Sequence, residues 1–186
     1  MSAVGPPRDR RAVPRSQSPL EGQRATRASG GHIQALAPPG GERRAAPIRR
    51  DHSPPFRLPV RVYYEDTDAA GVVYYANYLK FMERARTEWL ESRGFPLAAF
   101  EREHGVVFVV HRCEIDFLQP ARLNDALNVS VEPVKLGAST IKARQDVCRG
   151  ADILTSALVT LACLDAVRWR PVRMPVVLVT NLENPA

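Results

Sequence analysis

The sequence predicts an α+β domain in which an antiparallel sheet wraps around one long helix. The main observation is that the spacing of apolar residues changes twice along the chain. Apolar residues alternate in one run, recur every three or four residues in one amphipathic stretch, and alternate again in four or five later runs. Period two is typical of strands with one buried face, and the longer period is typical of a helix. One strand, one helix and then several strands is an order that favours a sheet packed against the helix.

The first strand is expected within Phe56–Tyr64, starting near Leu58 with Pro59 at its beginning. A polar loop that ends in glycine follows over Glu65–Gly71, and then a short apolar segment, Val72–Tyr75. This segment leads directly into the helix.

The helix is expected from Asn77 to Arg93. Asn77 suits an N-cap position, and Gly94 followed by Pro96 suits the end of a helix. Charged residues occupy one side of the segment, and apolar residues recur on the other side: Tyr78, Phe81, Met82, Ala85, Trp89 and Leu90.

The later strands are expected at 106–110, 112–118, 127–131, 141–147 and 153–164, with turns at 119–121 and 149–151. The last of these runs is nearly continuously apolar, which predicts a central strand covered on both faces. Residues 168–175 are basic and proline-rich and are expected to be irregular, and Val176–Thr180 is interpreted as a short final strand. A sheet that curls around a helix leaves its other face for pairing, so we expect an oligomer.

Charge and composition divide the 186 residues into two parts. Residues 1–55 hold ten arginines and four acids, which is the whole net charge of +6, whereas 56–186 hold sixteen basic and sixteen acidic residues. All thirteen aromatic residues lie after position 55. We therefore expect 1–55 to be a disordered tail, or an over-extended start of the gene, and 56–186 to be one folded domain.

Several classes of protein are excluded by composition. No apolar run is long enough for a transmembrane helix or a secretory signal, so a cytoplasmic protein is expected, with no membrane insertion. Because the folded part carries no net charge, we expect no nucleic-acid partner; recruitment of nucleic acid or membrane by the basic tail is the alternative. Histidine and cysteine spacings predict no metal site and no cofactor. Three cysteines are expected to be reduced residues of the core: Cys113, Cys148 and Cys163.

The candidate chemistry lies between the first strand and the helix, where three carboxylates fall within four residues: Glu65, Asp66 and Asp68. One interpretation is a charged loop that favours the start of the helix. The other is catalytic. Gly71 allows a ligand to approach the backbone closely, and the free N–H groups of Tyr75 and Ala76 at the helix start would stabilise a developing negative charge. A carboxylate beside such a helix end is suited to the hydrolysis of an activated acyl group.

The run Val60–Phe95 closely resembles the 4-hydroxybenzoyl-CoA thioesterase family. It is most similar to the Tol–Pal-associated acyl-CoA thioesterase branch of the hotdog superfamily. The shared signature is D-x-D-x-x-G-V-V-Y-x-x-x-Y, here Asp66 to Tyr78, followed by an Arg- and Glu-rich helix. Weaker similarity extends over 57–175.

The resemblance implies a hotdog fold and a homodimer, often paired into a tetramer, with active sites at the subunit interface. It implies hydrolysis of an acyl-CoA thioester to a free acid and CoA. Asp68 would be the catalytic carboxylate, either general base or nucleophile, and the Tyr75 N–H would polarise the carbonyl. Substrate contacts are implied for six residues: Gly71, Val72, Tyr74, Lys135, Gly137 and Ser139. The alternative is a non-catalytic module that binds acyl-CoA or acyl-carrier protein on the same fold.

Two departures from the family pattern stand out. Many members of the branch carry His where this chain has Tyr75, and a tyrosine with an ordinary pKa near 10 is a poor base at neutral pH. The family also usually continues into a helix after the segment that ends at Pro175, whereas the last eleven residues are not predicted to be helical.

Overall fold

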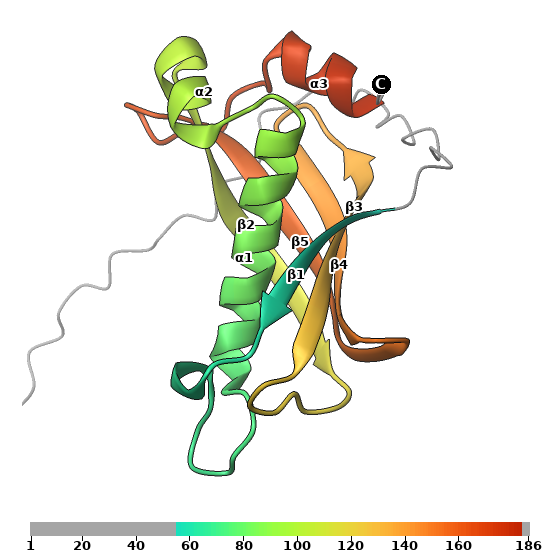
Figure 1. Ribbon diagram of the computed structural model, residues 1–186. Coiled ribbons are helices and arrows are strands. Elements are labelled where there is room, and N and C mark those ends of the chain that lie inside the picture. Colours follow the sequence, from blue (N-terminus) through green and yellow to red (C-terminus); the bar gives the residue numbers. More distant parts are fainter. Residues whose placement is uncertain (1–54, 184–186) are drawn as a thin grey trace, which may run out of the picture. The chain divides into compact units, whose positions relative to one another are not determined.

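The computed structural model describes residues 55–183 (Figure 1). The predictions for the tail over 1–55 therefore concern residues that lie, except for Pro55, outside the described part. No helix within 55–183 combines the length and the apolarity needed to cross a membrane. The elements, in chain order, are β1 (Phe56–Arg61), the 3-10 turn η1 (Tyr64–Asp66), α1 (Tyr75–Ser92), α2 (Leu97–His104), β2 (Val106–Phe117), β3 (Ala126–Leu136), β4 (Thr140–Arg149), β5 (Asp152–Asp165) and α3 (Val176–Glu183).

The five strands form one antiparallel sheet in the order β1-β3-β4-β5-β2. The sheet curves around α1, which lies along its concave face (Figure 1). This arrangement confirms the predicted α+β class and the hotdog fold. β5 is an inner strand, as predicted, but its residues alternate between buried and half-buried, so within one chain only the helix side is fully covered.

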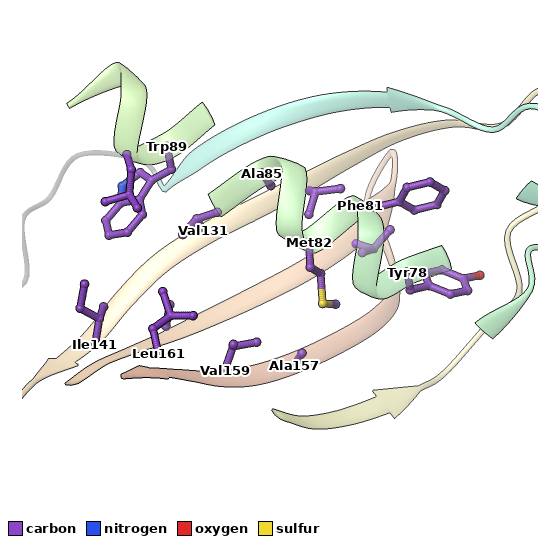
Figure 2. Close-up of a cluster of buried hydrophobic side chains, with 14 of the residues drawn as sticks. Tyr78, Phe81, Met82, Ala85, Trp89, Val131, Ile141, Ala157, Val159 and Leu161 are labelled. Atoms are coloured by element: carbon purple, nitrogen blue, oxygen red, sulfur yellow. The ribbon is translucent and has the colours of Figure 1, made fainter. Parts of the chain in front are cut away.

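The core lies between α1 and the sheet. Met82 and Trp89 of the helix point towards apolar side chains of the sheet (Figure 2), and Phe81 of the same helix is equally buried. Each of these three side chains is at most 1% exposed, and burial of one such side chain contributes about 1.5–3 kcal/mol. The apolar stripe of α1 predicted from the sequence is thus its buried face.

One polar link crosses this apolar interface. Gln145 of β4 is fully buried; its amide donates to the Met82 carbonyl of α1 at 3.0 Å and its Oε1 accepts from Arg86 Nη1 at 2.6 Å. Arg86 also pairs with Glu83 one turn earlier. A buried polar group must find partners, and these partners exist only in one position of the helix over the sheet.

Three predicted boundaries are corrected by the structure. β1 begins at Phe56 rather than near Leu58, because it pairs along its whole length with β3, and it ends before Tyr64, which enters η1. α1 begins at Tyr75, and Asn77 lies inside it rather than capping it. The two runs at 106–110 and 112–118 are one strand, β2, interrupted by a bulge between Val110 and Arg112.

The prediction of a final strand over Val176–Thr180 is wrong, because these residues form α3. The amides of Leu178 and Val179 bond to the Pro175 carbonyl, and Leu178 and Leu182, one turn apart, are buried. The periodicity of these two leucines outweighs the strand preference of the valines. With α3 in place, the expected departure from the family pattern disappears.

A second helix, α2, was not predicted, although Pro96 and Gly105 mark its two ends. Gly105 has a φ of 63°, the left-handed conformation common after a helix. Cys148 and Cys163 are buried as predicted, and burial raises the pKa of the Cys163 thiol to about 11. Cys113, on β2, is exposed, so its assignment to the core is wrong.

Candidate functional site

The loop between β1 and α1 folds into a tight hairpin over Thr67–Val73. The Asp68 amide donates to the Val72 carbonyl at 3.0 Å, and the Gly71 amide donates to the Asp68 carbonyl at 2.9 Å. Gly71 has a φ of 72°, which residues with a side chain rarely adopt. The backbone conformation of the turn is therefore a reason for a glycine at position 71, in addition to any close approach of a ligand.

The three carboxylates of this loop have different surroundings. Asp66 is only 7% exposed, and its Oδ2 accepts the Tyr63 N–H at 2.9 Å, so it holds η1 together. Glu65 and Asp68 are exposed. Asp68 Oδ1 accepts the Ala70 N–H at 2.8 Å within its own turn. Of the two aspartates of the D-x-D motif, the first is structural and the second faces solvent.

The start of α1 is open. Tyr74 is the N-cap residue, no side chain of the described residues caps this end, and the first turn contains no acid. The interpretation that the three acids assist helix initiation therefore finds no contact in the structure. The amides of Tyr75 and Ala76 belong to the first turn, whose N–H groups have no partner inside a helix. Together with the helix dipole they form a site of positive potential.

An apolar cavity of about 260 Å³ opens beside this helix end. Its lining combines the residue before the N-cap and the first turn of α1 with the end of β2 and the segment after it: Val73, Tyr75, Tyr78, Phe117, Leu118, Gln119 and Pro120. The Phe117 ring meets Tyr75 and Tyr78 edge-on, with centroids 6.2 and 5.8 Å apart. Phe117 is 49% exposed, so the cavity remains open on that side within one chain.

Two tyrosines next to the cavity are held in their neutral form. Burial raises the pKa of Tyr78, whose hydroxyl oxygen accepts the Ala121 N–H at 2.8 Å. A hydrogen bond with Tyr75, and to a lesser degree the nearby charge of Asp68, raise the pKa of Tyr74. Tyr74 occupies the N-cap position of α1, so the charge of Asp68 acts at the start of this helix.

The predicted site residues fall into two groups. Asp68, Gly71, Val72, Tyr74 and Tyr75 lie together in the hairpin and the helix start.

Lys135 lies near the end of β3, and Gly137 and Ser139 lie in the β3–β4 turn, at the other end of α1 and next to α3 (Figure 1). Since α1 has 18 residues, the two ends are roughly 27 Å apart at 1.5 Å per residue. Met174 before α3 donates to the Ala138 carbonyl at 2.9 Å. One chain therefore does not bring the two groups together.

Residues of the cavity were only partly predicted. The sequence predicts Phe117 and Leu118 as strand residues, without a role in the site. The alternation of apolar residues in β2 signals which side of the strand Phe117 occupies. Its proximity to Tyr75 depends on the curvature of the sheet, which sequence periodicity does not report.

Comparisons with known proteins identify the family of this chain. The family model described as "Thioesterase superfamily" matches residues 70–156. The "Acyl-CoA thioesterase YbgC" of Haemophilus influenzae is 44% identical over 120 residues, which cover 64% of this chain and 88% of that protein. The chain belongs to the thioesterase superfamily, in its YbgC branch. This membership confirms the resemblance drawn from the motif between Asp66 and Tyr78.

Two further thioesterases support the assignment to the superfamily. The "Acyl-CoA thioester hydrolase YbgC" of Escherichia coli is 40% identical over 130 residues, covering 69% of this chain and 96% of that protein. A crystal structure of a Thermus thermophilus thioesterase, described as complexed with coenzyme A and Zn, is 31% identical, with a TM-score of 0.59 and coverage of 68% of this chain and 90% of that one.

Proposed function

We propose that this protein hydrolyses acyl-CoA thioesters to a free acid and CoA. The observation that carries the proposal is the meeting of three features: the exposed Asp68 carboxylate, the uncapped start of α1, and the apolar cavity lined by Tyr75 and Phe117. The acyl group would enter the cavity, with its carbonyl oxygen on the Tyr75 N–H. The names of the two YbgC relatives support the same reaction.

Asp68 would act in one of two ways. As a general base it takes a proton from water, the water oxygen attacks the carbonyl carbon, and the C–S bond breaks to release the CoA thiolate. As a nucleophile its own oxygen attacks the carbonyl carbon, the same bond breaks, and water then cleaves the resulting anhydride. In both cases the Tyr75 N–H stabilises the oxyanion. A thiolate is a good leaving group, with a thiol pKa of about 8.5, so the site needs no strong acid.

Contacts with CoA are proposed for Lys135, Gly137 and Ser139, with the Lys135 ammonium on a phosphate. In the β3–β4 turn, a Cβ at Gly137 would lie 2.5 Å from Thr140 Oγ1, so a side chain there would require the Thr140 side chain to move. Because this turn is far from Asp68 in the same chain, a second copy would have to supply it. This proposal therefore requires a homodimer, which a tetramer would contain twice.

The edge strand β2 is the surface that we propose for this pairing. Its outer side faces no other strand of the described residues, and Cys113 and Phe117 are exposed on it. A long exposed edge strand is normally covered. If two copies pair antiparallel with both helices on one side of the joined sheet, a register centred on Cys113 sets Arg112 opposite Glu114 of the partner subunit. The next register sets the two Glu114 side chains against each other, so charge favours the first.

Oxidation of the native protein should cross-link this dimer through Cys113. Directly opposite residues of an antiparallel pair have Cα atoms about 4.5–5.5 Å apart, within the range of disulfides. Glu114→Arg should weaken the dimer and the thioesterase activity, and Arg112→Glu combined with Glu114→Arg should restore both, measured by light scattering and thiol release. Cys113→Ser is the control for the cross-link. A fully active monomer, or a dimer that never cross-links, contradicts this pairing.

A panel of short, long and aromatic acyl-CoAs tests the proposed function. Release of the CoA thiol is followed with a chromogenic thiol reagent, and binding is measured by calorimetry on the same preparation. Turnover of at least one substrate class supports a hydrolase. Tight binding of several acyl-CoAs without thiol release contradicts it and favours the non-catalytic binding module.

A further inference from the structure

Asn77 is a buried polar residue in the first turn of α1, and it touches the loop that carries Asp68. The residue is 6% exposed, and its side-chain Nδ2 donates to the Asp66 carbonyl at 2.9 Å. The Tyr74 N–H donates to the same oxygen, also at 2.9 Å. A single carbonyl oxygen thus receives two hydrogen bonds, one from the residue before the helix and one from the helix itself.

The same loop is held on its other side by Ala121. The Ala121 carbonyl accepts the Val73 N–H at 2.9 Å, and the Ala121 N–H donates to the Tyr78 hydroxyl oxygen at 2.8 Å. The hairpin that carries Asp68 is therefore clamped between the first turn of α1 and the segment after β2. Both clamps use a buried side chain of the first turn of α1, but only Asn77 bonds the loop itself, whereas Tyr78 acts through Ala121.

We infer that Asn77 is a positioning residue for the reaction and acts through Asp68. Its amide fixes the distance between the Asp68 carboxylate and the Tyr75 N–H, although Asn77 itself does not line the cavity. The inference rests on the proposed thioesterase activity, in which these two groups act on one carbonyl. Catalysis is sensitive to such distances, because a displacement of about 1 Å costs about a hundredfold in rate.

The test compares Asn77→Ala with Ser92→Ala. Ser92 lies at the other end of α1 and also bonds a backbone carbonyl, that of Trp89 at 2.8 Å, so its variant reports the loss of one helix hydrogen bond away from the site. With both proteins assayed well below their melting temperatures, Asn77→Ala should lower kcat about tenfold to a hundredfold with KM changed less than twofold, and Ser92→Ala should change neither. If both variants lose melting temperature and the kcat of Asn77→Ala is unchanged, the inference is overturned.

A double-variant cycle separates positioning from a general effect on folding. If Asn77 acts through Asp68, adding Asn77→Ala to an Asp68→Asn protein should lower the residual rate less than twofold, because the group being positioned is already inactive. An undiminished tenfold loss in that background would overturn the inference. Full activity of Asp68→Asn alone would instead refute the proposed mechanism, so the two failures are distinguishable.

Discussion

Asp68→Asn is expected to lower kcat by about 10²–10⁴-fold, the usual contribution of a general base. The substitution is conservative for the fold, because an asparagine Oδ1 can still accept the Ala70 N–H that closes the turn. What is lost is the negative charge and the ability to take a proton or attack a carbonyl. The measurement is the steady-state rate of thiol release together with the thermal melting curve.

Two matched variants complete this experiment. Glu65→Gln removes the other exposed carboxylate of the loop and should leave kcat within about twofold, since this side chain is not assigned to the reaction. Asp68→Ala removes both the charge and the turn contact, so it should be as inactive as Asp68→Asn and also less stable, by about 1 kcal/mol for one lost hydrogen bond. Activity of Asp68→Asn within a few-fold of the unmodified protein would end the catalytic assignment.

Tyr75→Pro is expected to lower kcat by about 10²–10³-fold, the effect of removing one oxyanion donor. Tyr75 is the first residue of α1, the position at which proline is best tolerated in a helix. Tyr74 has φ −59° and ψ 129°, a conformation that a following proline accepts. The substitution should therefore remove the N–H while the helix stays intact, which circular dichroism checks.

The side chain of Tyr75 needs its own control, because it lines the cavity. Tyr75→Ala removes the ring and keeps the N–H, and Tyr75→Phe removes only the hydroxyl. Tyr75→Phe should leave kcat within a few-fold, since the phenol is not used as a base. The ratio of the kcat of Tyr75→Ala to the kcat of Tyr75→Pro gives the contribution of the backbone N–H. Equal rates for these two variants would show that another group binds the oxyanion.

The fold was predictable because the chain changes periodicity clearly at its long helix. Apolar residues from Tyr78 to Leu90 recur at helical spacing and form the buried face, and alternation marked most of the strands. The last helix was not predicted because its valines favour a strand, while Leu178 and Leu182 are spaced as in a helix. Local composition does not decide such a segment; the packing of its leucines does.

The grouping of the candidate site residues was predictable where these residues are local in the chain. Asp68, Gly71 and Tyr75 lie within eight residues, and one hairpin and one helix start bring them together. The position of Phe117 beside Tyr75 and the role that we propose for Asn77 escaped prediction, because both depend on contacts across the fold. The distance of Lys135 from Asp68 likewise follows from strand direction and helix length, which the motif does not contain.

The buried link between Gln145 and α1 has a consequence for the evolution of specificity. An interface of apolar side chains alone tolerates small rotations of a helix, since two apolar surfaces can pack in many nearly equivalent ways. The hydrogen bonds of Gln145 with Arg86 and with the Met82 carbonyl remove that freedom, because they fix the position of α1 relative to β4. Side chains that line the cavity, such as Phe117 and Leu118, can therefore differ without moving the start of α1. Under the proposed thioesterase activity, a helix held in this way lets the acyl-group preference change while Asp68 and the Tyr75 N–H keep their places.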